Sequence, residues 1–409
     1  MSKIILFNDK KDCCGCGACM NVCPKQAITM EKDEYSFIYP VIDEEKCVEC
    51  EMCKKVCGYQ KNPETISNIN TWVAVNKNES ELKKSASGGI FAGIAKAFIE
   101  DGGVVFGCAM VLENNILTPK HIMVDSVKDL YKLQGSKYVQ SYMENNYQLV
   151  KEMLKAHKKV LFSGTPCQVA GLNAFLGGKQ YDDLFTIDII CHGVPSADFF
   201  QAYIEELNKK NNGNVTSFLF RDKDNGWGLT ASVTYTDTTG NNTKKLLSAW
   251  KSSYYSLFLS SKTYRINCYS CPFAGLNRPG NITIGDFWGI EKQHPEYLNG
   301  SVAKVDETKG VSCILVNNEQ GTKLIETYNK NLQLLKSDVK SAAKDNGQLN
   351  VPSPYSKDRE MILNMYKNKK YEAIDKWYRK SIGPKYPLKL LKDSIPKPVK
   401  KAVKKMLGK

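Results

Sequence analysis

Two cysteine runs near the N-terminus constrain this chain more than any other feature of its sequence. In the first run the cysteines are separated by two, two and three residues, and Pro24 follows the last of them. The second run repeats this spacing. In a reducing compartment, so dense a pattern favours metal ligation over disulfides. The cysteines of the two runs are Cys13, Cys16, Cys19 and Cys23, then Cys47, Cys50, Cys53 and Cys57.

This spacing suits a particular kind of metal centre. Three thiolates on one tight loop can each reach a different iron of a [4Fe–4S] cubane, and in bacterial ferredoxins the fourth cysteine ligates the other cluster. Zinc is the alternative, but zinc sites usually combine two cysteine pairs separated by a longer gap. Cys14 lies outside the spacing, and we interpret it as a plain thiol beside a cluster. The pattern predicts two [4Fe–4S] clusters, one on Cys13, Cys16, Cys19 and Cys57 and one on Cys47, Cys50, Cys53 and Cys23.

The rest of the composition is that of a globular protein with a basic C-terminus. No apolar run approaches the roughly 18 residues of a membrane span, and the N-terminus becomes polar too soon for a signal peptide. We therefore expect a cytoplasmic location. Of the net charge of +14, about +11 falls from Lys376 onward, where only Asp393 opposes the lysines and arginines. Because the remainder is nearly balanced, we expect a basic tail and no nucleic-acid binding.

Three parts are expected along the chain. Residues 58–70 are polar and typical of a linker, and beyond them strand and helix patterns alternate, which predicts an α/β domain. We expect a small α+β domain of the bacterial-ferredoxin type at 1–62, an α/β large domain at 70–345 and the basic tail at 346–409. The expected strands are 72–75, 104–107, 160–162, 185–190, 231–235 and 312–316, and the expected helices are 90–100, 145–156, 168–176 and 199–210.

Three loops place small polar residues just before an expected helix, at 85–89, 163–168 and 191–196. In the second loop Thr165 suits a helix N-cap and Pro166 the first helical position. Backbone amides at a helix start suit a phosphate, and open α/β sheets bind ligands at the carboxyl ends of their strands. The loops therefore indicate a phosphate-bearing cofactor, with ordinary capped helices as the alternative.

A second, scattered set of cysteines accompanies these loops. Cys268 and Cys271 form a pair with a gap of two residues, and Cys167 and Cys191 each follow an expected strand. These four could hold a third cluster or be plain buried thiols, and the residues alone leave both interpretations open. Cys108 and Cys313 fall within apolar strands, and we expect both in the core.

Six motifs in order resemble one known family. They are Ser-Gly-Gly at 87–89, Gly-Ser-Lys-Tyr-Val-Gln-Ser at 135–141, Gly-Thr-Pro-Cys-Gln-Val-Ala-Gly-Leu at 164–172, Cys-His-Gly-Val-Pro-Ser at 191–196, the cysteine pair at 268–271 and Asn-Ile-Thr-Ile-Gly-Asp-Phe-Trp-Gly at 281–289. Over about residues 1–320 the chain resembles the coenzyme F-420 hydrogenase/dehydrogenase beta-subunit family, with a ferredoxin-type domain in front.

The resemblance implies an FAD in the large domain and a cluster close to it, and so favours the third cluster on Cys167, Cys191, Cys268 and Cys271. The expected flavin-binding residues are Ser87, Gly88, Gly89, Gly135, Ser136, Lys137, Gly164, Thr165 and Pro166. Lys137 would supply a charge near the flavin. His192 would donate a proton or serve a structural hydrogen bond. Arg221 and Lys223 would clamp an acidic substrate or lie on a solvated loop.

These parts predict an iron–sulfur flavoprotein oxidoreductase. A ferredoxin or similar donor would feed the clusters, and FAD would join their one-electron steps to two-electron chemistry on a small-molecule substrate, in either direction. The resemblance also extends to bacterial members associated with polysaccharide synthesis. The main alternative is a non-catalytic electron-transfer subunit that delivers to a partner enzyme.

The end of the tail has a helical pattern of its own. Val399, Val403, Met406 and Leu407 recur at helical spacing after Pro398, with lysines on the other face. Such a basic amphipathic helix can lie on an anionic membrane surface. We weigh this peripheral membrane contact equally against a frayed, solvated terminus, because so short a helix is marginal alone.

Overall fold

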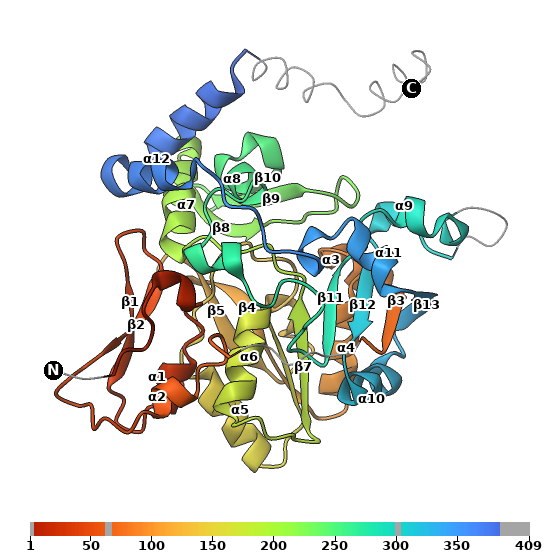
Figure 1. Ribbon diagram of the computed structural model, residues 1–409. Coiled ribbons are helices and arrows are strands. Elements are labelled where there is room, and N and C mark those ends of the chain that lie inside the picture. Colours follow the sequence, from red (N-terminus) through yellow and green to blue (C-terminus); the bar gives the residue numbers. More distant parts are fainter. Residues whose placement is uncertain (1–3, 62–67, 299–303, 385–409) are drawn as a thin grey trace.

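The computed structural model describes residues 4–61, 68–298 and 304–384. Its centre is an eight-stranded mixed sheet with the order β13-β3-β12-β11-β7-β6-β4-β5 (Figure 1). This confirms the α/β character expected for the large domain. The strands are β3 (Asn70–Asn76), β4 (Val104–Glu113), β5 (Ile116–Val124), β6 (Val160–Gly164), β7 (Leu184–Ile189), β11 (Ile282–Asp286), β12 (Ser312–Val316) and β13 (Leu332–Ser337).

Four neighbouring strands of this sheet, β4, β6, β7 and β11, are parallel. Their carboxyl ends therefore meet at one edge, where the loops after β6, β7 and β11 lie together. β12 runs antiparallel to β11, so its first residue, Ser312, reaches the same edge opposite Asp286. This edge is where ligands bind in open α/β sheets.

Helices cover both faces of the sheet. Side chains alternate between the two faces along each strand, so apolar neighbours in one strand pack into separate cores. On β4, Val105 packs into a core with α4 (Ile90–Glu100) and α10 (Glu319–Tyr328). The next residue, Phe106, packs into a separate core with α5 (Asn146–Lys155) and α6 (Pro166–Phe175). Thr165 caps α6 and Pro166 opens it, as the sequence predicts.

A second layer lies above the large sheet in the view of Figure 1, and the sequence predicted only some of its elements. It is a three-stranded antiparallel sheet packed against three helices around an aromatic core. The sequence predicted its helix 199–210 and its strand 231–235, but not its other members. The elements are β8 (Asn214–Leu219), β9 (Thr230–Thr236), β10 (Asn242–Ser248), α7 (Ala197–Asn211), α8 (Ser253–Leu259) and α12 (Arg359–Ile382).

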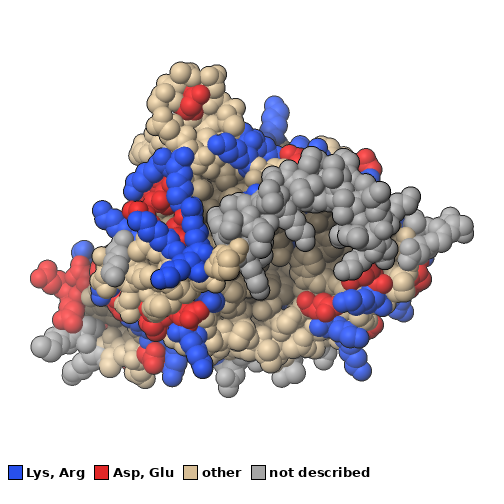
Figure 2. Space-filling view, turned by 90° about the horizontal axis from the view of Figure 1, so that it is seen from above, with Lys and Arg blue, Asp and Glu red and all other residues tan. Residues whose placement is uncertain are grey.

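Part of the basic segment expected from residue 346 forms helix α12, which packs into the second layer. Helix α12 buries Ile362, Leu363, Tyr371 and Ile374 in the core of the second layer, bending where Lys370 leaves helical geometry. Figure 2 shows Lys and Arg interspersed with Asp and Glu on the face seen from above. The lysine-rich end and its predicted amphipathic helix, 398–407, lie outside the described residues.

The N-terminal module lies beside α5 and α6 (Figure 1). It contains an antiparallel hairpin of β1 (Ile28–Lys32) and β2 (Ile38–Ile42) and two short helices, α1 (Ala18–Val22) and α2 (Met52–Lys55). Two glycines permit close packing against α6. A Cβ on Gly58 would lie 2.5 Å from the Ala170 carbonyl oxygen, and one on Gly171 would lie 3.0 Å from Cys16 Sγ.

Within the described ranges, the structure contains no helix with both the length and the apolar character that crossing a membrane requires.

Candidate functional site

The first group of cysteines brings the two runs of the N-terminal module together. The sulfur of Cys57, from the end of the second run, acts electrostatically on Cys13 and Cys19 of the first, and Cys16 also acts on both. Burial is the main reason that the pKa of Cys13 rises to about 11. Gly15 and Gly17 shape this loop through positive φ angles of 68° and 77°, which glycine adopts without strain. We call Cys13, Cys16, Cys19 and Cys57 the inner set.

The second group lies at the molecular surface. Cys23, Cys47, Cys50 and Cys53 line one small cavity with apolar neighbours such as Ala27 and Ile42. The backbone N–H of Ala27 donates to Cys23 Sγ at 3.3 Å, and the Cys50 side chain is exposed. We call these four cysteines the outer set.

Both sets fit the cluster type that the spacing predicts. Each offers four thiol donors, and the outer set surrounds an apolar cavity, which suits a cubane with sulfide corners. In the described parts of the chain, no three His, Cys, Asp or Glu side chains converge closely enough to hold a single metal ion. The crossed ligation stays a prediction that this arrangement supports.

Cys14, interpreted from the sequence as a plain thiol beside a cluster, interacts with cysteines of two different groups. It is buried between the inner set and the large domain, and its pKa is raised well above the ordinary value by hydrogen bonds with Cys16 and Cys167. The hydrogen bond from Cys14 also lowers the pKa of Cys167 to about 7. Tyr59, Ala170 and Phe273 pack around Cys14. No local pattern indicates this bridge, because Cys167 lies 153 residues away.

The third group contains the four scattered cysteines, which the fold gathers at the edge of the sheet. Cys191 interacts electrostatically with Cys167 and Cys271, and Cys268 with the other three. Burial raises the pKa of Cys191 to about 12 and that of Cys271 to about 11. We call Cys167, Cys191, Cys268 and Cys271 the third set. Four partly buried thiols in one place fit a further cubane by their donor chemistry.

Beside the third set, a cavity of about 260 Å³ opens at the carboxyl ends of β6, β7 and β11. All three of the predicted loops reach this cavity, and the phosphate-bearing cofactor expected beside them stays a prediction. Its lining includes both predicted catalytic residues, Lys137 and His192, and seven of the nine predicted flavin-binding residues, namely Ser87, Gly89, Gly135, Ser136, Lys137, Gly164 and Thr165.

The two remaining residues of that prediction, Gly88 and Pro166, do not line the cavity. Gly88 is a packing residue: its N–H donates to Ser312 Oγ at 2.9 Å, and a Cβ there would lie 2.4 Å from the Ala74 carbonyl oxygen. Pro166 is buried as the first residue of α6. Cys108, expected in the core, instead lines the cavity, whereas Cys313 is buried in β12 as expected.

Two features of the cavity wall suit a phosphate-bearing ligand, an open stretch of backbone and the starts of two helices. Gly89 and Gly135 have φ angles of 75° and 80°, and a Cβ on Gly135 would meet no atom within 4 Å, so the backbone is open to a ligand there. Helices α4 and α6 both begin at the wall, which gives it positive helix ends.

Lys137 and His192 have different environments within this wall. The Lys137 ammonium donates to the carbonyl oxygens of Gln134 at 2.8 Å and Lys132 at 3.3 Å. Burial lowers the pKa of Lys137 to about 8. Desolvation also lowers the pKa of His192, although its side chain is exposed to the cavity. His192 is therefore mostly neutral near pH 7.

Neither Arg221 nor Lys223 is free to clamp an acidic substrate. Arg221 is bidentate to Asp286, at 2.8 and 3.0 Å, and also donates to the Tyr138 hydroxyl and the Gly228 carbonyl. Lys223 donates to the carbonyl oxygens of Leu82 at 2.8 Å and Ser87 at 2.5 Å. Both side chains stabilise the wall of the cavity instead.

Sequence reasoning missed a polar network beneath the cavity. Gln168 Nε2 donates to Ser141 Oγ at 2.9 Å, and Ser141 Oγ lies 3.1 Å from His121 Nδ1. His121 Nε2 lies 3.2 Å from the Ser163 carbonyl oxygen, and burial lowers the pKa of His121 to about 4. The neutral ring therefore donates to Ser163 and holds the end of strand β6.

Comparisons with known proteins agree with this arrangement. Residues 12–61 match the model of the 4Fe-4S dicluster domain. Residues 157–341, which contain the third set, match the model of the C terminus of the coenzyme F420 hydrogenase/dehydrogenase beta subunit. The chain belongs to this beta-subunit family. Its N-terminal module is a dicluster domain for two [4Fe–4S] clusters, and the chain is an iron–sulfur electron-transfer protein.

Individual relatives of this family member are distant. An uncharacterized protein of Methanocaldococcus jannaschii is 25% identical over 80% of this chain and 91% of its own length. One F(420)H(2) dehydrogenase subunit, from Methanosarcina mazei, is 24% identical over 44% of this chain, which spans about half (53%) of that relative. A chain of the F420-reducing [NiFe] hydrogenase complex from Methanosarcina barkeri aligns with a TM-score of 0.44 at 16% identity, covering 74% of this chain and 94% of that one.

Proposed function

We propose that this chain is an iron–sulfur flavoprotein oxidoreductase. Electrons from a ferredoxin-type donor pass from the outer set to the inner set, then to a third [4Fe–4S] cluster and to an FAD in the cavity, where a small-molecule substrate is reduced. The reverse direction is equally allowed. When bound, FAD supplies the conversion between the one-electron steps of clusters and two-electron hydride chemistry.

One continuous path of side chains carries this proposal. Cys14 contacts the sulfurs of Cys16 in the inner set and Cys167 in the third set. Thr165 Oγ1 lies 3.2 Å from Cys167 Sγ, and Thr165 itself lines the cavity. A connection from the N-terminal module to a ligand cavity supports an enzyme more than a separate electron carrier, which needs no such cavity.

The side chains of the cavity have separate roles in this proposal. The start of α6, capped by Thr165, and the start of α4 present positive helix ends to cofactor phosphates. Lys137 supplies the positive charge that favours an anionic, reduced cofactor. His192 faces the cavity beside the loop of Cys191 and is positioned to exchange a proton with substrate.

Metal and flavin content of anaerobically purified full-length protein tests the proposal. We expect about twelve irons, three cubanes of four, and one FAD per chain. The alternative, a non-catalytic subunit that delivers to a partner enzyme, predicts about eight irons and no flavin. Cys268→Ser should lower the iron content from about twelve to about eight, whereas the matched variant Cys313→Ser, outside all three sets, should retain about twelve.

The substrate is tested on the same material. After photochemical reduction, candidate oxidants are added and the return of the flavin absorbance is followed. A deazaflavin represents the chemistry named in the family, and lipid-linked sugar precursors represent the polysaccharide hypothesis. Reoxidation by one class at micromolar concentration assigns the reaction, and reoxidation only by a partner protein assigns the electron-transfer alternative.

A further inference from the structure

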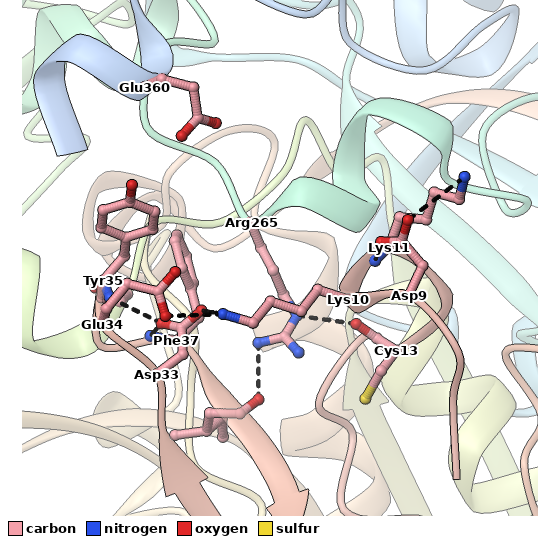
Figure 3. A network of polar contacts seen from close by, with 12 residues as sticks. Asp9, Lys10, Lys11, Cys13, Asp33, Glu34, Tyr35, Phe37, Arg265 and Glu360 are labelled. Carbon is pink, nitrogen blue, oxygen red and sulfur yellow. Dashed lines mark hydrogen bonds and ion pairs between the residues drawn. The ribbon is translucent and has the colours of Figure 1, made fainter. Parts of the chain in front are cut away.

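Arg265 is a buried cation at the junction of the N-terminal module and the large domain. Its side chain is 0% exposed, and it precedes Cys268 of the third set by three residues. The guanidinium nevertheless reaches into the N-terminal module: Nε donates to the Cys13 carbonyl oxygen at 3.1 Å and Nη1 to the Ile38 carbonyl oxygen at 2.8 Å. Figure 3 shows this side chain extending between Cys13 and the strand that follows Phe37.

This guanidinium has no carboxylate to balance its charge. Its Nη2 is buried without a hydrogen-bond partner. The nearby acids are engaged elsewhere: Asp33 and Glu34 pair with Lys10 at 2.8 and 2.9 Å (Figure 3). Glu360 pairs with Arg359. Among the residues that the structure describes, no Asp or Glu forms an ion pair with Arg265. Its other contacts are aromatic, with the Tyr39 ring 3.9 Å from the guanidinium carbon.

A buried charge without a counter-ion is strongly unfavourable, so an anion is expected where this one is held. The inner set provides that anion. The guanidinium lies against its loop, because a Cβ on Gly15 would lie 3.3 Å from Arg265 Cζ. The charge of Arg265 acts on Cys13 of the inner set and also on Cys167 of the third set. Four thiolates around a cubane give a net negative charge that increases with each electron added.

We propose that Arg265 is a positioning residue that makes the cluster of the inner set easier to reduce than the cluster of the outer set. Its charge stabilises the added electron, and its two bonds to carbonyl oxygens fix it against the ligand loop. The outer set differs because its lysine neighbours, such as Lys54 and Lys55, are exposed to solvent. One electron leaves the outer cluster, which is oxidised, and enters the inner cluster, which is reduced. Electrons from a ferredoxin-type donor therefore move from the outer cluster towards the inner one.

Redox titration monitored by electron paramagnetic resonance tests this role in the full-length protein. In Arg265→Gln we expect the equilibrium constant for reducing the inner cluster to fall at least tenfold, about 59 mV for one electron, with a much smaller change for the outer cluster. Arg265→Lys keeps the charge on a side chain without the planar fork. Because the charge is kept, it should shift the same cluster by less than threefold, under about 28 mV, and so retain most of the wild-type midpoint.

Two further variants serve as references. Cys57→Ser identifies which signal belongs to the inner cluster. Arg359→Gln removes another buried arginine that lies near Phe37, 5.9 Å from its ring, but that pairs with Glu360, and it should leave both midpoints unchanged. Equal shifts of both clusters, or a shift of the inner midpoint in the lysine variant as large as that in the glutamine variant, would overturn the proposal.

This redox titration compares the midpoints of the inner and outer clusters only. A wild-type protein that lacked flavin and the third cluster would refute the proposed function while leaving this experiment intact.

Discussion

Arg278 and Asp188 form a fully buried ion pair between the loop after Cys271 and the end of strand β7 before Cys191. Nη2 and Nε of Arg278 contact Asp188 Oδ1 at 2.7 and 3.1 Å, and the two side chains are 1% and 0% exposed. Arg278 also donates to the carbonyl oxygens of Phe273 and Ile189. It therefore ties the loop after Cys271 to the strand end before Cys191.

Asp188→Asn should release this connection. Breaking a buried ion pair leaves an uncompensated charge and costs about 3–5 kcal/mol of stability. Because both segments adjoin cysteines of the third set, we also expect the iron content to fall from about twelve towards eight per chain. Anaerobic urea unfolding followed by tryptophan fluorescence, together with iron analysis, measures both effects.

A surface pair provides the control for that variant. Lys330 and Glu100 contact each other at 2.7 Å with 59% and 37% of their side chains exposed, so Glu100→Gln should cost no more than about 1 kcal/mol. Full iron content in Asp188→Asn would show that the loops keep their positions without the pair.

The crossed ligation makes a second prediction. Cys57 lies in the second run but interacts with Cys13 and Cys19 of the first. Cys57→Ser should therefore remove or distort the inner cluster and leave the outer cluster intact, with a loss of up to about four irons. Cys313→Ser is the matched control, since it changes a buried cysteine of β12 that belongs to no set. Loss of the exposed outer cluster in Cys57→Ser would mean that each run holds its own cluster.

Gly171 makes a third prediction, about the contact between the module and α6. A Cβ at this position would lie 2.8 Å from the Tyr147 hydroxyl oxygen and 3.0 Å from Cys16 Sγ. Gly171→Ala should therefore force the inner loop away from the helix, at a cost of about 1–3 kcal/mol for overpacking. The expected readout is slower reduction of the flavin by a donor that first reduces the N-terminal clusters.

The control for this substitution is Gly347→Ala, where a Cβ would meet no atom within 4 Å. Unchanged flavin reduction in Gly171→Ala would indicate that the Cys14 bridge tolerates a displaced loop.

Local patterns made much of the fold predictable. Helix α4 and strand β12 have the bounds that the sequence indicated, because their apolar periodicity and flanking residues are both strong. Strand β10 was missed because its first five residues are exposed and the first four of them are polar or charged, so that pairing with β9 determines it. Helix α12 was missed because the segment was interpreted by its many lysines alone. Its apolar residues, such as Ile362 and Ile374, are buried.

The residues of the candidate site also fall into those that local spacing predicts and those that only the fold brings together. Ligand cysteines of the N-terminal runs were predictable because one loop sets their spacing. Cys14, Arg265 and His121 act through partners 20 or more residues away, and only the fold brings them together. The same reason explains Arg221, whose partner Asp286 lies 65 residues further along and removes it from any substrate-binding role.

The last prediction concerns pH and Lys137. Burial lowers the pKa of Lys137 to about 8, from an ordinary value of 10.5. Below pH 8 the charged side chain attracts an anionic cofactor, and above it the neutral amine does not. Between pH 8 and 10.5 the unfolded chain binds more protons at this position than the folded chain, so stability contributed by Lys137 rises with pH. FAD affinity and protein stability should thus change in opposite directions.

Fluorescence titration of flavin-depleted protein at pH 7 and pH 9.5 measures the first of these effects. We expect FAD affinity to fall by about fivefold, equivalent to ~1 kcal/mol, over this range in the wild type. Lys137→Met should bind FAD weakly at both pH values, and urea unfolding of this variant should lack the rise in stability above pH 8. Lys158→Met, which changes an exposed lysine away from the cavity, should behave as wild type. If Lys137→Met retained the pH dependence of the wild type, the charge that attracts the cofactor would have to belong to another group in the cavity.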